Sequence, residues 1–312
     1  MKLSKKIFCT LGPSSLNKDF LNYITDKVYL VRLNLSHVEE DELEYLINYI
    51  KKHTSVKICI DTEGAQIRTK TKQSKKFELN EKGSIDNFKF YPQVSFEKDD
   101  VLQVGFDNLI IKFLDNKNFI CISPGLFETN KGVHVINRKI KLNPLTSKDL
   151  RCIEISKKHN IENYALSFTN SVSDINLFKD LLKDKNTIFK LETQKAVTNL
   201  NLLIKEADNF LIDRGDLSKE VTKELIPYTQ RFIIKKVKEQ NKNVFVATNH
   251  LESMIEKSYP TNAELNDIYS TLEMGANGIV LAAETAIGNN PIKCVNQCLK
   301  IIEVYNAQYY KF

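Results

Sequence analysis

A lysine and two carboxylates stand at the ends of neighbouring apolar segments. Lys190 and Glu192 end one such segment, and Asp216 follows the next one in the run Arg214-Gly215-Asp216. A hard divalent cation prefers oxygen ligands of the carboxylate type. A lysine beside that cation can stabilise negative charge that develops on a transferred group or an enolate. These residue types therefore predict an active site that holds a metal ion.

Short β-rich runs alternate along the chain with longer segments of helical periodicity. The β-rich runs contain few polar residues, which is typical of strands buried on both faces of a parallel sheet. Eight such units predict an α/β fold, the (β/α)8 or TIM barrel. The predicted strands are residues 6–11, 28–33, 56–61, 163–168, 187–191, 209–213, 244–247 and 278–281. The predicted helices include residues 39–52, 174–183, 196–206, 219–239 and 263–274.

The alternation is interrupted once, after the third predicted strand. Residues 70–132 contain several β-prone runs and turn residues but no segment of helix-length periodicity. We therefore expect a small β domain to be inserted there. The barrel is expected to consist of residues 1–69 and 133–312.

Polar residues that could bind ligands stand at or just beyond the ends of all the predicted strands. Catalytic groups of (β/α)8 barrels lie at the carboxyl ends of the strands, so this pattern predicts a site at that end of the barrel. The residues are Thr10, Arg32, Asn34, Asp61, Thr62, Ser167, Lys190, Glu192, Asp216, Thr248 and Glu284.

The overall composition limits the possible partners. The formal charge of +6, from 45 Lys+Arg against 39 Asp+Glu, is spread along the chain. It favours an anionic small molecule and argues against nucleic acid. The six cysteines show no CxxC spacing and are predicted to be buried thiols rather than zinc ligands or disulfides. Without a signal-like segment or an apolar run of about 18 residues, we expect a cytoplasmic protein that does not contact a membrane. We expect a monomer or a small homo-oligomer.

Ten short motifs resemble, in order, those of the pyruvate kinase family. They cover nearly the whole predicted barrel, and the resemblance is to a divergent member that has no C-terminal regulatory domain and has a shortened inserted β domain. The resemblance implies that the barrel is catalytic and that residues 70–132 form a small β-barrel lid domain. The motifs lie at residues 6–13, 31–37, 61–69, 130–133, 165–168, 190–192, 214–217, 247–254, 260–264 and 283–286.

The resemblance implies a role for each matching residue at the reacting centre. Lys190 and Arg32 contact the transferring phosphoryl group, and Thr248 supports protonation of the enolate. Glu192 and Asp216 hold a divalent cation, Mg²⁺ or Mn²⁺. Phosphoryl transfer depends mainly on positioning and charge neutralisation, so a cation, a lysine and an arginine are a sufficient set.

The resemblance also implies sites for K⁺, for ATP or ADP, and for a small carboxylate or phosphate substrate. Charged side chains would contact the nucleotide phosphates, and backbone amides at a helix start would hold a substrate carboxylate. The implied residues are Asn34, Ser36, Asp61 and Thr62 for potassium; Pro13, Arg68 and Lys131 for the nucleotide; and Ser167, Asp213, Arg214, Gly215 and Glu284 for the substrate.

The sequence also departs from the family's usual pattern. Asp213 stands where the family usually has alanine, at the position that faces the methylene or methyl group of the substrate. A carboxylate there would repel an anionic ligand unless the substrate carries a donor or a positive group. Asn170, Thr193 and His250 also replace the family's usual residues.

Three functions follow from these residues. The first is a pyruvate-kinase-like phosphotransferase that moves a phosphoryl group between phosphoenolpyruvate, or a related carboxylate, and an adenine nucleotide with a divalent cation and K⁺. The second, suggested by Asp213, is an ATP-dependent kinase of a different hydroxy- or amino-carboxylate in specialised biosynthesis. The third is a metal-dependent enolpyruvate lyase or aldolase, which would have no use for Arg68 and Lys131. A catalytically idle binding protein is disfavoured because both metal carboxylates are present.

Overall fold

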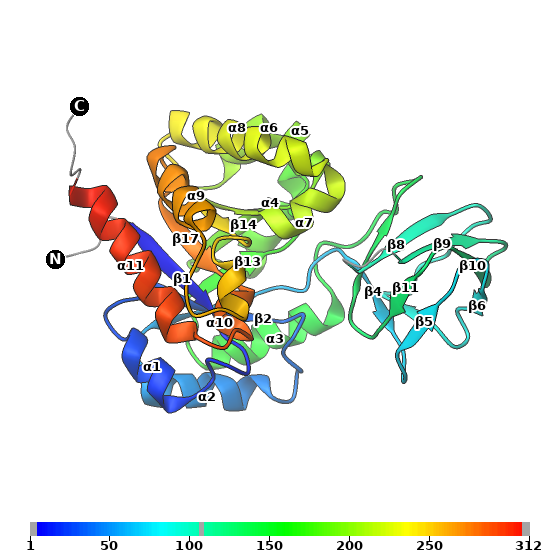
Figure 1. The fold of residues 1–312 in the computed structure, drawn as a ribbon, viewed down its shortest axis with the longest axis horizontal. Helices are drawn as coiled ribbons and strands as arrows, with labels where there is room; N and C mark the ends of the chain where they lie inside the picture. The colour runs from blue at the N-terminus through cyan, green and yellow to red at the C-terminus, as the bar shows by residue number, and fades with distance from the viewer. Residues whose placement is uncertain (1–4, 106–108, 308–312) are drawn as a thin grey trace. The chain divides into compact units, whose positions relative to one another are not determined.

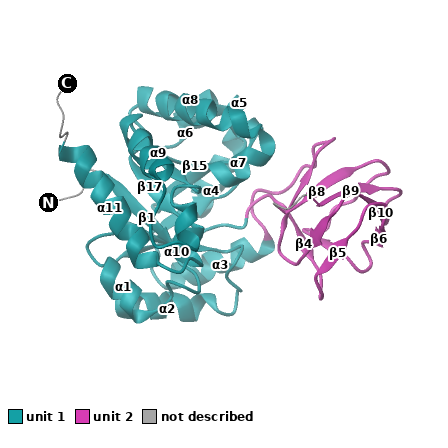
Figure 2. Cartoon of the chain, in the orientation of Figure 1, with its two compact units in different colours: residues 1–63, 147–312 teal, residues 64–146 magenta. Residues whose placement is uncertain are grey.

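The chain separates into two compact units (Figure 2). The computed structural model describes residues 5–105 and 109–307. The first unit consists of Met1–Glu63 and Ser147–Phe312, and the second of Gly64–Thr146. The second unit therefore begins at Gly64 rather than at residue 70 and ends at Thr146 rather than at residue 132. It is longer at both ends than the predicted insertion.

The first unit is a closed barrel of parallel strands with helices around it (Figure 1). Every predicted strand overlaps an observed one, so the predicted (β/α)8 barrel is confirmed. In order around the barrel the strands are β1 (Lys6–Thr10), β17 (Gly278–Leu281), β16 (Asn243–Ala247), β15 (Asn209–Asp213), β14 (Asn186–Leu191), β13 (Asn163–Leu166), β3 (Lys57–Asp61) and β2 (Leu30–Asn34).

An apolar layer fills the barrel interior. Successive side chains of a strand point to opposite faces, so alternate residues of each barrel strand point inward. The inward side chains of this layer are almost completely buried. They are Phe8, Leu30, Cys59, Ala165, Ile188, Leu211, Phe245, Ala247 and Val280.

The outer helices are α1 (Lys18–Ile24), α2 (Leu43–His53), α3 (Ser147–Lys158), α4 (Val172–Leu181), α5 (Gln194–Thr198), α6 (Leu200–Glu206), α7 (Arg214–Glu220), α8 (Ile226–Glu239), α9 (Asn262–Glu273), α10 (Ala283–Ala286) and α11 (Pro291–Ala307). Two predicted helices are interrupted. Predicted helix 196–206 is divided at Asn199, which ends α5 and begins α6. Predicted helix 219–239 is divided into α7 and α8, because Pro227 is tolerated in the first turn of a helix but not in its interior.

The second unit is built from antiparallel strands around its own core. One sheet has the order β6-β10-β9-β8-β12-β4-β7, and β11 pairs with β5. Its core is rich in phenylalanine, including Phe77, Phe113, Phe119 and Phe127, whose rings contact one another. That this second unit acts as a lid stays a prediction. The strands are β4 (Ile67–Lys70), β5 (Lys75–Phe77), β6 (Lys82–Ser84), β7 (Lys89–Tyr91), β8 (Val101–Val104), β9 (Leu109–Phe113), β10 (Asn118–Ser123), β11 (Gly125–Phe127) and β12 (Gly132–Val135).

All six cysteines are buried, as predicted. Across residues 5–105 and 109–307, no helix combines the length and the apolar composition that crossing a bilayer requires.

Closure of the barrel depends on a glycine where β1 meets β17. Gly278 pairs with Lys6, and a Cβ atom at position 278 would lie 2.1 Å from the Lys6 carbonyl oxygen. Because that oxygen belongs to a paired strand, it cannot move away without breaking the pairing. We expect Gly278→Ala to lower the free energy of unfolding by about 3 kcal/mol. Urea unfolding of the variant and the unaltered protein measures this difference, and equal stabilities would contradict the account.

Candidate active site

A charged layer lies directly above the apolar layer of the barrel. Every second side chain of a strand points inward, so the next inward position lies two residues beyond each residue of the apolar layer. Moving two residues from Phe8, Leu30, Cys59, Ala165, Ile188 and Leu211 gives Thr10, Arg32, Asp61, Ser167, Lys190 and Asp213. All six of these polar residues are buried. Strand alternation therefore brings predicted site residues from six strands to the same end of the barrel.

Lys190 is the centre of this layer. Its Nζ atom lies 2.8 Å from Glu192 Oε1 and 3.3 Å from Asp61 Oδ2, and it donates a hydrogen bond of 3.0 Å to Ser167 Oγ. Burial alone would lower the pKa of Lys190, but the carboxylates of Asp61, Glu192 and Asp213 outweigh burial and raise it. The ammonium group is therefore held in its charged form.

Arg32 and Asp61 form a second buried ion pair beside the lysine. Arg32 Nη1 donates to Asp61 Oδ2 at 2.9 Å, and Arg32 Nε donates to Thr10 Oγ1 at 3.0 Å. Ser167 Oγ lies 3.2 Å from Asp61 Oδ1. Asp61 thus pairs with both Arg32 and Lys190, and its removal would leave each of these buried cations with less negative charge nearby.

Glu192 is held by the loop that follows β13. Its Oε2 atom accepts a hydrogen bond of 2.6 Å from the backbone amide of Phe168, whose φ of 53° is unusual for a bulky residue. Asn170 supports this turn by donating to the Phe168 carbonyl at 2.8 Å, and the Thr193 hydroxyl donates to the Asn170 side chain. Two residues that depart from the family pattern therefore fix the backbone that binds Glu192.

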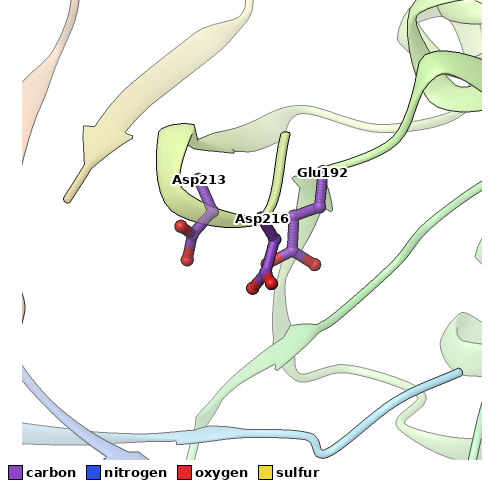
Figure 3. Close-up of side chains that lie close together, drawn as sticks. All are labelled: Glu192, Asp213 and Asp216. Atoms are coloured by element: carbon purple, nitrogen blue, oxygen red, sulfur yellow. The ribbon is translucent and has the colours of Figure 1, made fainter. Parts of the chain in front are cut away.

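Burial raises the pKa of Glu192 to about 8, and the nearby carboxylates of Asp213 and Asp216 add to this effect while Lys190 opposes it. The Oε1 atom of Glu192 is buried and close to Lys190 Nζ, but among the described residues it receives no aligned hydrogen bond. Glu192, Asp213 and Asp216 each offer an oxygen, and these three atoms lie within 4.8 Å of one another (Figure 3). Lys190 pairs with Glu192 and Lys219 pairs with Asp216, each at 2.8 Å, so the three carboxylates are not without cations. Their oxygen atoms are nevertheless the ligand type that a hard divalent cation prefers, and such a cation would relieve their mutual repulsion.

The residues predicted for potassium lie at the ends of two paired strands. β2 pairs with β3 so that Asn34 lies opposite Asp61. Asn34 Oδ1 accepts from the Ser36 amide at 3.0 Å, and Thr62 Oγ1 accepts from the Ser167 amide at 3.0 Å. The four predicted residues are therefore brought together at one edge of the barrel mouth, while their binding of K⁺ stays a prediction.

Thr248 has a backbone conformation that is rare for its residue type. Its φ is 69°, and a β-branched residue with positive φ is strained. The Thr248 carbonyl accepts from Arg214 Nε at 3.0 Å and also from Arg214 Nη2, while Thr248 Oγ1 accepts from the Gly215 amide at 2.8 Å. The start of α7 therefore holds Thr248 in place. The Gly215 amide, which is predicted to bind a substrate carboxylate, donates its hydrogen bond to Thr248 in this structure.

The Arg214 guanidinium belongs to a buried network that the sequence motifs did not predict. Its Nη1 atom donates to Asp267 Oδ1 at 2.8 Å and Oδ2 at 2.9 Å, and its Nη2 atom lies 3.1 Å from His250 Nδ1. His250 Nε2 lies 3.0 Å from the Val246 carbonyl, which can only accept, so Nε2 carries a proton. The one feature of the sequence that could have pointed to this network is His250, which replaces the family's usual residue.

The remaining predicted residues lie apart from the Lys190 cluster or in the other unit. Glu284 is buried, and its Oε2 atom accepts from the Ala282 amide at 3.1 Å. Within the described residues it makes no hydrogen bond or ion pair with Lys190. Pro13 lies exposed in the first unit. Arg68 and Lys131 belong to the second unit, where Lys131 Nζ pairs with a neighbouring glutamate at 2.9 Å.

His250 makes stability depend on pH. Burial, followed by the charge of Arg214, lowers the pKa of His250. The folded state then binds fewer protons than the unfolded state near pH 6.5, so the free energy of unfolding should fall as the pH drops from about 7.5 to about 5.5, by at most about 1.4 kcal/mol per pH unit. His250→Met should lose less stability over this interval. Urea unfolding at both pH values measures the difference.

A matched control is His159→Gln, because His159 lies outside this network and pairs with Glu44 near the surface. That variant should keep the pH dependence of the unaltered protein. Identical slopes for His250→Met and the unaltered protein would show that His250 does not cause the effect.

Comparison with known proteins agrees with this geometry. A family model described as the pyruvate kinase barrel domain matches residues 2–128 and 114–295. A pyruvate kinase of Thermotoga maritima is 31% identical over 96% of this chain and 70% of its own length. One of Clostridium acetobutylicum is 30% identical over 97% of this chain and 70% of its length. The plastidial pyruvate kinase 3 of Arabidopsis thaliana is 29% identical, and this chain spans 56% of its length. The chain therefore belongs to the pyruvate kinase family and is a phosphotransferase of the kinase class.

Proposed function

We propose that the protein transfers a phosphoryl group between phosphoenolpyruvate, or a closely related carboxylate, and an adenine nucleotide. The observation that carries the proposal is the convergence of Lys190 and Arg32 with the buried carboxylates of Asp61, Glu192 and Asp213 at the mouth of a barrel of this family. Phosphoryl transfer requires positioning and neutralisation of charge rather than covalent chemistry by the protein. These side chains provide fixed charges in a largely water-excluded site, where their electrostatic effect is strongest.

Each group has a distinct task in this proposal. Lys190 and Arg32 orient the phosphoryl group and neutralise the charge that develops on it. Glu192 and Asp216 would hold the divalent cation, which would supply positive charge to neutralise substrate oxygens. Thr248, held in its strained conformation by Arg214, supports delivery of a proton to the enolate carbon.

The sites for K⁺ and for the nucleotide complete the proposal. Asn34, Ser36, Asp61 and Thr62 supply oxygen atoms to K⁺. The predicted contacts to nucleotide phosphates come from Arg68 and Lys131, whose charged side chains suit phosphate oxygens.

Lys190→Met tests the main proposal. The unaltered protein should form ATP from ADP and phosphoenolpyruvate with Mg²⁺ and K⁺ present. The variant removes the charge that stabilises the transferring group, so the rate should fall by a factor on the order of 10³ or more. A coupled assay for ATP formation measures both proteins. Lys236→Met, which removes a surface lysine paired with Glu239, should keep full activity. Absence of turnover by the unaltered protein would reject this substrate pair.

One observation favours a second candidate, an ATP-dependent kinase of a hydroxy- or amino-carboxylate. Asp213 adds a buried carboxylate to the charged layer, so Asp61, Glu192 and Asp213 outnumber the cations Lys190 and Arg32. The additional negative charge disfavours a highly anionic substrate and favours one with a hydroxyl or amino group.

Asp213→Ala tests the second candidate. ATP consumption should be measured for a panel of hydroxy and amino acids, with phosphoenolpyruvate and ADP as the reverse-direction reference. If the second candidate is right, the unaltered protein uses a member of the panel, and the variant shifts its relative kcat/KM toward phosphoenolpyruvate by roughly tenfold, as expected for loss of one repulsive contact. An unchanged preference would remove the basis for this candidate.

A further inference from the structure

We propose that Asp213 supplies a third carboxylate ligand to the divalent cation held by Glu192 and Asp216. The inference rests on the cation site of the proposed function and adds a ligand to it.

The position of Asp213 on β15 directs its side chain into the barrel. Leu211, two residues earlier, belongs to the apolar layer of the interior, so Asp213 occupies the next inward position. Asp213 also precedes the first residue of α7, where an aspartate commonly caps a helix. Its side chain makes no capping hydrogen bond there. The usual structural reason for an aspartate at this place is therefore absent.

The Asp213 carboxylate is largely buried and has one long ion pair. Its side chain is only 7% exposed, and the closest cation is Lys190 Nζ at 3.8 Å, beyond hydrogen-bond distance. Lys190 lies closer to Glu192 and Asp61. Among the residues that the structure describes, no hydrogen bond reaches the Asp213 carboxylate. Burying an ionised carboxylate in this way is costly unless another positive charge shares the site.

The direction of the neighbouring carboxylates shows where that charge would lie. Figure 3 shows Glu192, Asp213 and Asp216 extending toward the same region, and their ligand oxygens lie within 4.8 Å of one another. Glu192 Oε1 is buried in the same region, where it forms an ion pair with Lys190 Nζ at 2.8 Å. A cluster of oxygen donors alone suits Mg²⁺ or Mn²⁺. Asp213 thus has the orientation, the surroundings and the chemistry of a ligand.

The competing explanation is that Asp213 serves only as a distant counter-ion of Lys190. Binding of Mn²⁺ alone, measured by electron paramagnetic resonance of the free ion, separates the two by the size of the effect, because a carboxylate that does not touch the cation acts on it only through a more distant and weaker charge. Asp213→Ala should weaken Mn²⁺ binding by roughly tenfold or more, since affinity follows the number of charged ligands. Asp213→Asn, which keeps one neutral oxygen, should lie between Asp213→Ala and the unaltered protein.

Asp100→Asn is the matched control. Asp100 is a buried aspartate of the second unit that pairs with Arg138, so its loss removes a buried carboxylate elsewhere and should leave Mn²⁺ affinity unchanged. Circular dichroism of each variant establishes that it is folded, and the isosteric Asp213→Asn decides the question if Asp213→Ala does not fold.

The outcomes separate this inference from the proposed function. If both Asp213 variants bind Mn²⁺ as the unaltered protein does while Glu192→Gln binds it more weakly, Asp213 is not a ligand and the cation site itself stands. If the unaltered protein does not bind Mn²⁺, the inference and the metal-dependent function are both overturned.

Discussion

The mouth of the barrel is organised by a buried ammonium group that is shared among several carboxylates. Lys190 contacts Glu192 and Asp61, and Asp61 in turn binds Arg32. None of these charges could be buried alone at a tolerable free energy, so Lys190 and Arg32 and the carboxylates around them stabilise one another's charged forms. The carboxylates, in contrast, repel one another and raise the pKa of Glu192.

The loops around this cluster are held in conformations that their residues seldom adopt. Phe168 and Thr248 both have positive φ, and the carbonyl of each accepts a hydrogen bond from a polar side chain, Asn170 of the same loop for Phe168 and Arg214 at the start of α7 for Thr248. Such strain persists only where the surroundings determine the backbone. Here it aims the Phe168 amide at Glu192 and places the Thr248 hydroxyl at the start of α7. The same loops contain Asn170 and His250, where the chain departs from its family.

The added carboxylate of Asp213 connects the cation site with the choice of substrate. A third acidic ligand would bind the cation more tightly and would also reduce the positive charge that the loaded site offers to an anion. In this proposal, metal affinity and substrate charge would be coupled through one residue of β15.

The sequence by itself determined the barrel strands and identified the polar residues at their ends that are predicted to be catalytic. Buried strands appear as short apolar runs, which are local features of the chain, and the polar residues at the ends of these runs include Lys190, Glu192 and Asp216. Only the tertiary structure decided which charges meet. The Arg214 guanidinium binds Asp267 and His250, which lie far along the chain, and this could not be inferred from the run Arg214-Gly215-Asp216. Likewise, Asp213 could be an ordinary helix cap in sequence, whereas barrel closure places it beside Lys190. The partners of an ion pair depend on which strand ends come together when the barrel closes. The distance between two such ends is not encoded in any local sequence pattern.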